Sequence, residues 1–485
     1  MPRRPMRVTD KDEALLRGAL RELRTRMEVP ADFPAEVREE AARAARGPRM
    51  PAEDATDLPL FTIDPPGAAD LDQAMYLARR APGGFRVYYA IADVAAFVAP
   101  GGALDAEAHR RVLTLYFPDD RVPLHPPVLG EGAASLLPDQ DRPAVLWQLD
   151  LDEYGALVAA DVRRAVVRSR ARLDYDGVQR TIDSGTAEEP LSLLRDIGLL
   201  REERERARGG ISLDVPEQEI VVEDGRYRLA YRAPLPADGW NAQLSLLTGM
   251  AAADLMLDCG TGTLRTLPAA PDGAVGRLHR CARALGIDWP HHTSYAQLIR
   301  GLDPRRTTHA AFLQECTALL RGAGYTVFDG EAPAPGDALH AAVAAPYTHA
   351  TAPIRRLVDR YVSEVCLAAA AGEPVPEWVR AALPALPEEM AAGGRRAHQA
   401  ERESVDLVEA AVLRDRVGEL FDAYVVDLRE DRPQQGTVHL CEPAVVGRVD
   451  ADPDGPPLPL GHPLRVRLTA AEPGRDPVRF VPAAR

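Results

Sequence analysis

The sequence predicts an α/β (α+β) protein whose main body is a mixed β-sheet with packed helices. Three observations predict this class. Residues 58–152 have a texture of strands and turns, apolar residues at helical spacing dominate residues 240–416, and short strands separated by Gly, Pro and Asp follow from residue 417. The chain has 485 residues, which is enough for several domains around a substantial core.

Residues 1–57 predict a short helical module followed by a Pro-rich linker. Thr9 is a suitable N-cap for a first helix, because an acidic turn and leucines at helical spacing follow it. A Pro-containing break precedes a second predicted helix at residues 35–46. Two amphipathic helices fit half of a helix-turn-helix RNA-binding module and fit equally well a helical cap on the main body.

The rest of the chain predicts two further domains, at residues 58–416 and 417–485. Residues 85–92 form an apolar run typical of a buried strand, and arginines alternate along residues 162–173, so one face of that strand is expected to be cationic. The last 70 residues or so match the size of a small OB-type β-barrel.

Composition restricts the class of protein further. The net charge of −15 argues against a polycation that coats nucleic acid, although it leaves room for a local positive channel. Lys11 is the only lysine, so any phosphate contact is expected to use a guanidinium. No apolar run approaches the ~20 residues of a membrane span, and the five cysteines are scattered without a CxxC pair. We therefore expect a cytoplasmic protein, a monomer, with no membrane partner.

The most informative segment is residues 61–74, Phe-Thr-Ile-Asp-Pro-Pro-Gly-Ala-Ala-Asp-Leu-Asp-Gln-Ala. A strand is expected to deliver Asp64, and Asp70 and Asp72 follow after a Pro-Pro-Gly turn. Three carboxylates this close repel one another unless a cation lies among them, and ligands that are all oxygen favour Mg²⁺ or Mn²⁺. An EF-hand is excluded because the loop lacks its glycine and its closing glutamate. A solvated acidic turn is the structural alternative, and the apolar flanks weigh against it.

This segment resembles the signature of the ribonuclease II (RNB) family of processive exoribonucleases. Further blocks resemble the family in the same order along the chain, and together they cover roughly residues 58–416. These blocks are Ile91-Ala92-Asp93-Val94 with Leu104-Asp105, Tyr116 with Val122-Pro123-Leu124, Arg208-Gly209-Gly210, and Tyr347-Thr348-His349-Ala350-Thr351-Ala352-Pro353-Ile354-Arg355-Arg356 with Asp359.

The resemblance implies a 3′→5′ exoribonuclease with an RNB-type catalytic domain. Such an enzyme hydrolyses RNA phosphodiesters from the 3′ end by metal-activated water and releases nucleoside 5′-monophosphates. The resemblance assigns the metal site to Asp64, Asp70, Asp72 and Gln73, with Mg²⁺ as the expected ion and Mn²⁺ as the alternative. Asp70, Asp72 and Arg355 are the expected catalytic residues, and a guanidinium beside the reacting phosphate suits stabilisation of developing charge.

The resemblance also implies a set of RNA-binding residues. Tyr116 matches the aromatic residue that stacks on the 3′-terminal base, and Arg355, Arg356 and Glu401 complete the set. Stacking tolerates any sequence, as an unspecific nuclease requires. A core position is the alternative for Tyr116, and an ion pair with Asp359 is the alternative for Arg355.

The chain departs from the family pattern at several places. Gln73 stands where many members carry a fourth aspartate, which puts the metal affinity and the number of ions in doubt. Leu213 lies where some members place a second aromatic, and Gln243 lies near a family glutamate. About 57 residues precede the signature, too few for the paired cold-shock barrels of larger members.

Single-stranded RNA 3′ ends are therefore the expected substrate, and an open entrance would also admit structured RNA with a 3′ overhang. Two alternatives stay open. One is a distributive or weakly active nuclease, because of Gln73. The other is a catalytically inactive RNA-binding protein on the same fold.

Overall fold

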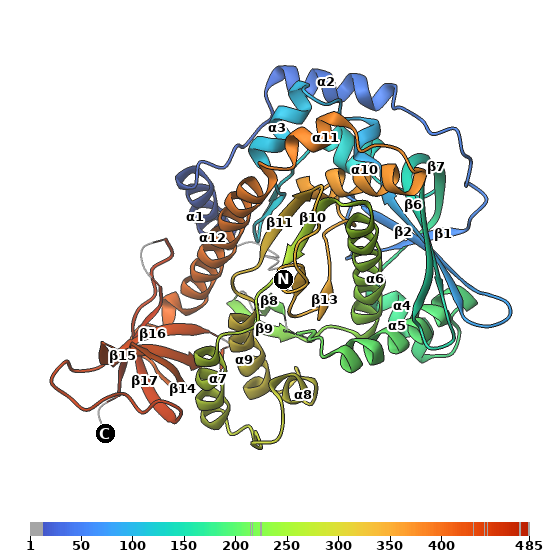
Figure 1. Ribbon diagram of the computed structural model, residues 1–485. Helices are drawn as coiled ribbons and strands as arrows, with labels where there is room; N and C mark the ends of the chain where they lie inside the picture. The colour runs from blue at the N-terminus through green and yellow to red at the C-terminus, as the bar shows by residue number, and fades with distance from the viewer. Residues whose placement is uncertain are drawn as a thin grey trace.

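Two closed five-stranded β-barrels, joined through a layer of helices, make up the protein. The computed structural model describes residues 13–213, 215, 217–223, 226–429, 431–440, 442–443, 445–474 and 477–483. In Figure 1 the C-terminal barrel lies at the lower left, the first barrel lies at the right, and helices fill the space between them. The mixed helix and sheet class that the sequence predicts is confirmed.

The first barrel closes because its first and last strands pair in parallel while all other neighbours are antiparallel. Tyr89 and Trp147 are among its fully buried side chains, and the buried strand predicted at residues 85–92 is confirmed. Its strands, in barrel order, are β1 (Leu60–Ile63), β2 (Gln73–Arg79), β3 (Phe85–Ala92), β6 (Asp141–Leu151) and β7 (Leu157–Leu173). Since β1 ends beside the start of β2, the acidic segment between them lies at one rim of the barrel.

Helices pack around this barrel and account for the helical texture predicted after residue 240. Residues of α6 and α10 lie in the same buried cluster as the apolar residues of the barrel, and Gly260 and Gly372, in the left-handed region, end these two helices. The helices are α3 (Ala103–Arg111), α4 (Tyr175–Asp183), α5 (Glu189–Arg208), α6 (Pro236–Cys259), α7 (Asp272–Ala284), α8 (Tyr295–Arg300), α9 (Thr307–Cys316), α10 (Leu357–Ala371), α11 (Glu377–Ala382) and α12 (Leu386–Leu413).

Short elements connect these larger ones, and the helical texture after residue 240 did not indicate the strands among them at residues 261–346. They form two-stranded sheets or single helical turns on the body of the protein. They are η1 (Val94–Ala96), β4 (Leu115–Tyr116), β5 (Arg121–Val122), η2 (Leu129–Ala133), β8 (Glu217–Glu223), β9 (Arg226–Arg232), β10 (Thr261–Thr266), η3 (Thr317–Leu320), β11 (Gly324–Asp329), β12 (Leu339–His340), β13 (Ala345–Pro346) and η4 (Arg414–Arg416).

The two N-terminal helices, α1 (Glu13–Arg26) and α2 (Ala35–Arg46), bury their apolar residues in different clusters. The leucines of α1 join a cluster with α12 and the C-terminal barrel, whereas Val37 and Ala41 of α2 join a cluster with the first barrel. This is the arrangement expected of helical caps. The second helix has the predicted bounds, and the predicted N-cap Thr9 lies outside the described residues.

The C-terminal barrel confirms the OB-type fold predicted for the end of the chain. Val425, Val438, Val466 and Phe480 are fully buried in its core. Its strands, in barrel order, are β14 (Leu420–Arg429), β15 (Arg432–Leu440), β16 (Val446–Asp450), β18 (Arg479–Pro482) and β17 (Pro463–Ala470). The domain boundaries at residues 57/58 and 416/417 stay predictions.

Among the described residues, no helix has the length and apolar character to cross a bilayer.

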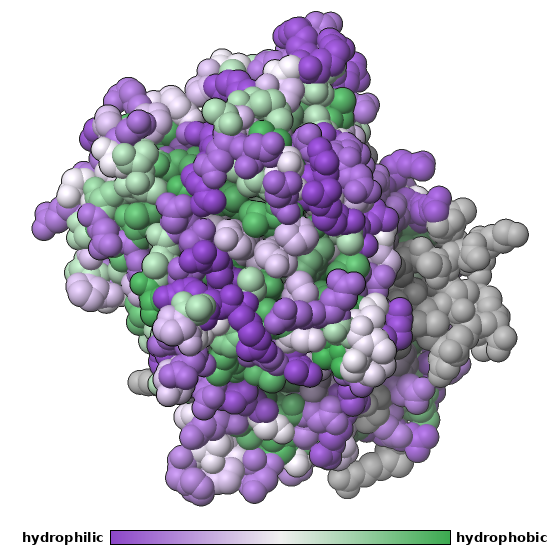
Figure 2. Space-filling model, turned by 90° about the vertical axis from the view of Figure 1, so that its right-hand side faces the viewer, coloured by the Kyte–Doolittle hydropathy of each residue, from purple (hydrophilic) through white to green (hydrophobic). Residues whose placement is uncertain are grey.

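Acidic partners neutralise part of the cationic face that the sequence predicts for β7. Two of its four alternating arginines form ion pairs with carboxylates, and the other two are exposed and donate to backbone carbonyl oxygens. The partners are Asp93 and Glu364 for Arg164, Asp141 for Arg168, the carbonyl of Thr56 for Arg170, and the carbonyl of Ala68 for Arg172. On the side of the molecule that Figure 2 shows, hydrophilic side chains alternate with smaller hydrophobic patches.

Candidate active site

The acidic segment is fixed where it enters and leaves the barrel. The Asp64 N–H donates to the carbonyl of Leu173 at 3.1 Å, which continues the parallel pairing of β1 with β7. On the return, Leu71 is fully buried and its N–H donates to the hydroxyl of Ser135 at 2.9 Å. Because side chains alternate along an extended chain, a buried Leu71 fixes the directions of the residues on either side of it.

Asp72 is the most deeply buried acid of the segment, with 1 % of its surface exposed. Its Oδ1 accepts the N–H of Ile354 at 2.8 Å, and its Oδ2 lies 3.4 Å from Nε of Arg355. Among the described residues, Oδ2 has no hydrogen-bond partner. Burial raises the pKa of Asp72 to about 7, although the charge of Arg355 opposes the shift.

Asp64 lies in a similar electrostatic environment. Its Oδ2 is buried and finds no hydrogen-bond partner in the described part of the chain. Burial raises the pKa of Asp64 to about 6, while Arg355 lowers it and the charge of Asp70 raises it further. Arg355 and Asp70 therefore lie close enough to affect the charges of both Asp64 and Asp72, and a joint metal site of the three aspartates stays a prediction.

Asp70 is engaged by Arg121, a residue that the sequence analysis missed. The Arg121 guanidinium donates to Oδ1 of Asp70, and its other terminal nitrogen lies 2.8 Å from Oε1 of Glu131. Arg121 belongs to the β4–β5 hairpin, where it pairs in register with Tyr116. Proximity to a predicted RNA-stacking tyrosine was the one available signal, since Arg121 is 51 residues from Asp70 in sequence.

Gln73 connects the start of β2 to a distant segment. Its amide nitrogen donates to the carbonyl of Thr351, and its amide oxygen accepts the Tyr89 hydroxyl at 3.4 Å. Both ends of the amide are thus engaged within the protein. A metal-ligand role for Gln73 stays a prediction.

The segment that approaches the acids, residues 351–359, is held by a buried carboxylate. Asp359 is fully buried and accepts the Ala352 N–H at 2.7 Å, and the Arg356 guanidinium donates to both of its oxygens. The ion pair considered for Arg355 and Asp359 is therefore wrong, because Asp359 pairs with Arg356. Arg355 faces Asp72 instead, and RNA contacts of Arg355 and Arg356 stay predictions.

The remaining predicted residues lie on three different elements. Tyr116 is 37 % exposed, so the core alternative for this residue is wrong. Glu401 lies on α12, a helix that packs against β4, the strand of Tyr116. Gln243 is buried in α6 and donates to Oε2 of Glu205 at 2.5 Å.

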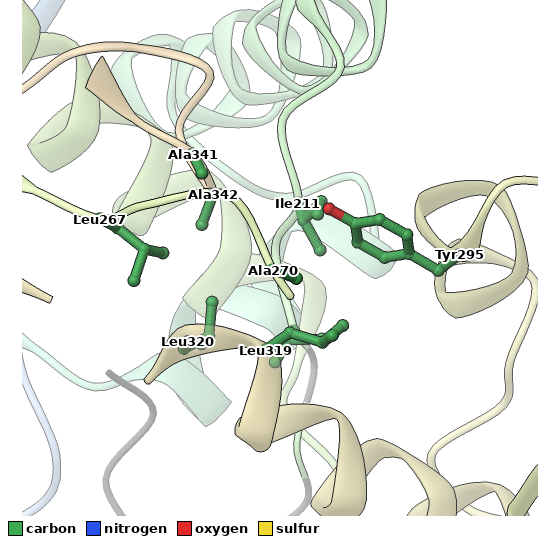
Figure 3. Close-up of a pocket in the computed structure, with 9 residues that line it drawn as sticks. Ile211, Leu267, Ala270, Tyr295, Leu319, Leu320, Ala341 and Ala342 are labelled. Atoms are coloured by element: carbon green, nitrogen blue, oxygen red, sulfur yellow. The ribbon is translucent and has the colours of Figure 1, made fainter. Parts of the chain in front are cut away.

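Leu213 lines the small apolar pocket of Figure 3, where Ile211, Tyr295 and Leu319 also contribute. The structure thus gives Leu213 apolar neighbours, and the clamping of a base from one side by Tyr116 stays a prediction.

Two of the three acids can offer an oxygen to a divalent cation. Within the described ranges, no group of three or more His, Cys, Asp or Glu side chains is arranged to hold a metal by itself. Asp64 and Asp72 nevertheless each offer a buried oxygen without a hydrogen-bond partner in the described structure. Mg²⁺ in phosphoryl-transfer sites usually binds one or two carboxylates and completes its shell with water and substrate phosphate. The residues therefore fit such an ion through Asp64 and Asp72, with Asp70 beside them.

The barrel with an acidic rim, the surrounding helices and the second barrel define an RNB-type fold with a terminal OB-type domain. Comparison with family models agrees. The model of the RNB domain matches residues 52–371, and the model of the RNase II-type exonuclease C-terminal S1 domain matches residues 419–483. The chain belongs to the RNB domain family.

Individual relatives are distant in sequence and close in fold. Ribonuclease R of Escherichia coli is 28 % identical over 416 residues, which cover 80 % of this chain and 50 % of the relative. The apo form of Mycoplasma genitalium RNase R superposes with a TM-score of 0.82 at 19 % identity, over 97 % of this chain and 78 % of the other. Yeast Ssd1, described as a pseudonuclease, reaches a TM-score of 0.67 at 17 % identity, over 84 % and 52 % of the two chains. The chain spans about half the length of Escherichia coli ribonuclease R.

Proposed function

We propose that the chain is a metal-dependent 3′→5′ exoribonuclease that releases nucleoside 5′-monophosphates from RNA 3′ ends. One observation carries the proposal. Two buried carboxylate oxygens, on Asp64 and Asp72, lack hydrogen-bond partners among the described residues, and Arg355 lies beside them. Buried carboxylate oxygens without hydrogen-bond partners are costly in a purely structural role, which favours a site that binds a cation and phosphate.

The residues divide the chemistry among them. Asp64 and Asp72, with Asp70 beside them, would hold Mg²⁺ or Mn²⁺, which when bound neutralises phosphate charge and activates water. The guanidinium of Arg355 donates to a non-bridging oxygen of the scissile phosphate and stabilises the charge that develops there. Asp72 keeps this guanidinium in place through the 3.4 Å contact between Oδ2 and Nε.

The substrate follows from the surroundings of these groups. Tyr116 is the exposed aromatic of the β4–β5 hairpin and stacks on the 3′-terminal base of single-stranded RNA. Arg356 and Glu401 complete the proposed RNA contacts. We further propose that structured RNA with a 3′ overhang is also a substrate. A 5′-labelled hairpin with such an overhang tests this. Digestion into the stem is expected, and stalling many nucleotides before the stem counts against it.

A second candidate is a catalytically inactive RNA-binding protein. The engaged side chains favour it, because Asp70 is bound by Arg121 and both ends of the Gln73 amide have protein partners. The likeness to a pseudonuclease shows that the fold also occurs without nuclease activity.

One experiment separates the two candidates. A 5′-labelled single-stranded RNA is incubated with Mg²⁺ and the wild type or Asp72→Asn, and the products are resolved at single-nucleotide resolution. Asn keeps an oxygen for the Ile354 N–H, so the variant is expected to fold. The proposal predicts a ladder that shortens from the 3′ end and a rate at least about 100-fold lower in the variant. Discrete internal cuts, or equal rates in both proteins, contradict it, and RNA binding without any product identifies the second candidate.

A further inference from the structure

The β4–β5 hairpin, which carries Tyr116 and Arg121, is attached to the candidate active site at two points. The Thr114 N–H, just before β4, donates to the carbonyl of Arg355 at 3.0 Å. On the other strand, Arg121 donates to Asp70. A shift of this hairpin therefore displaces both the backbone of Arg355 and the partner of Asp70.

The outer side of the hairpin is held by α1. Both terminal nitrogens of Arg24 donate to the carboxylate of Asp119, at 2.6 and 3.0 Å. The Arg24 guanidinium also lies over the Phe117 ring, 5.2 Å from its centroid. Asp119 lies in the turn of the hairpin, which is closed by a 2.8 Å hydrogen bond from the Phe117 N–H to the carbonyl of Asp120.

This contact is better shielded from water than an ordinary surface ion pair. The side chains of Arg24 and Asp119 are 18 % and 9 % exposed. A two-point guanidinium–carboxylate pair fixes orientation as well as distance. Apolar packing supports it, because residues of α1 and of the hairpin share one buried cluster. Its members from these two elements are Leu16, Leu20, Leu23, Leu115, Phe117 and Val122.

We propose that α1 is a positioning element for the RNA 3′ end, in which the pair Arg24–Asp119 holds the β4–β5 hairpin so that Tyr116 meets the terminal base. The inference rests on the proposed function, because it assigns the ligand of the hairpin as the 3′-terminal nucleotide. Arg24 is a positioning residue, since it acts through Asp119 and Phe117.

The same helix provides a matched control. Arg26 forms an ion pair with Glu403 of α12, so Arg26→Ala removes an ion pair of α1 that does not involve the hairpin. If the helix merely stabilised the fold, neither substitution would affect the hairpin selectively. A positioning helix makes Arg24 specific for the hairpin.

Two measurements on the full chain test the proposal. Hydrogen exchange compares the amides of residues 114–122 in the wild type, Arg24→Ala and Arg26→Ala. Fluorescence anisotropy in a chelator, where RNA is not hydrolysed, measures the affinity of each protein for a single-stranded RNA with an intact or an abasic 3′-terminal nucleotide. Tyr116→Ala serves as the reference for loss of stacking.

The proposal predicts faster exchange of the hairpin in Arg24→Ala and unchanged exchange in Arg26→Ala. Arg24→Ala is expected to weaken binding of the intact RNA by about threefold to tenfold, to leave binding of the abasic RNA unchanged, and to add little to Tyr116→Ala. The double variant Arg24→Asp/Asp119→Arg is expected to restore part of the loss.

Three results would overturn the proposal. If hydrogen exchange of the hairpin is the same in all proteins, α1 does not hold the hairpin. Equal weakening of intact and abasic RNA by Arg24→Ala removes the link to the terminal base. If Tyr116→Ala weakens the binding of intact and abasic RNA equally, or of neither, the stacking role in the proposed function fails, and the positioning of the base fails with it even where hydrogen exchange responds to Arg24.

Discussion

The two barrels of this protein have the same number of strands and differ in the surroundings of their acidic residues. Both close with five strands around an apolar core. At the rim of the first, Asp64 and Asp72 each have a buried oxygen without a hydrogen-bond partner in the described structure. In the second, Asp431 is exposed in the turn between β14 and β15 and pairs with Arg429, which lowers its pKa.

The difference shows that the candidate site does not belong to the barrel as such. It arises where residues 351–359 return to the rim, where the Ile354 N–H donates to Asp72 and Arg355 lies beside the same carboxylate. Within the described part of the chain no comparable segment covers Asp431, whose side chain is 62 % exposed. A barrel is thus a scaffold, and the covering segment determines whether its acids acquire unusual chemistry.

The largest effect is expected from Arg355→Ala. Removing a donor that stabilises charge in the transition state is expected to lower the rate of single-turnover hydrolysis by about 100-fold or more. Arg46→Ala, at the exposed end of α2, is the control and is expected to keep the wild-type rate. A loss of less than about threefold in Arg355→Ala would place the reaction elsewhere.

The pH dependence of unfolding is expected to separate the two barrels. Burial raises the pKa of Asp72 from its usual 3.8 to about 7 in the folded protein. Such an acid retains its proton on folding, so the stability that it contributes is complete below about pH 4 and is lost as the pH rises through about 7. Asp72→Asn removes this loss.

Thermal and urea unfolding in a chelator measures this effect. The free energy of unfolding of Asp72→Asn, relative to wild type, is expected to increase by about 2 to 3 kcal/mol between about pH 5 and about pH 8. Asp431→Asn, in the second barrel, is expected to leave the pH dependence in this range unchanged. Parallel curves for wild type and Asp72→Asn would mean that Asp72 ionises normally.

Two tightly packed glycines extend the comparison to function. A Cβ on Gly249 of α6 would lie 2.3 Å from Cε2 of Tyr347 and 2.5 Å from the carbonyl oxygen of Thr348, and a Cβ on Gly447 of β16 would lie 2.4 Å from Cε2 of Phe480. Both alanine variants are expected to lose about 1 to 3 kcal/mol of stability. Only Gly249→Ala is expected to slow hydrolysis of a short RNA as well, because it displaces the segment that leads to Arg355. Equal rates in the two variants, measured below their melting temperatures, would argue against this coupling.

Local pattern predicted the elements well and the contacts poorly. The strand at residues 85–92 and the helix at residues 35–46 follow from apolar runs and periodicity that the chain carries within each element. The pairing of Arg121 with Asp70 joins residues from different elements, and no local pattern encodes it. Asp359 pairs with Arg356 and not with Arg355, and this pairing depends on the backbone path of one turn.

The candidate site shows the same contrast between local pattern and contacts distant in sequence. The aspartates were recognisable because three acids follow one another within nine residues. The contacts that surround the buried carboxylate of Asp72 come from a segment almost 300 residues away. The engagement of Gln73 by Thr351 depends on that same segment, and the sequence around Gln73 did not reveal it.

Cation binding tests the central claim most directly, because it does not depend on RNA turnover. Isothermal titration calorimetry with Mn²⁺ compares wild type, Asp64→Asn, Asp72→Asn and the second-barrel control Asp431→Asn. We predict that wild type and Asp431→Asn bind alike, while Asp64→Asn and Asp72→Asn lose at least about tenfold in affinity. Equal binding by all four proteins would contradict the assignment of the first-barrel rim as the metal-dependent centre.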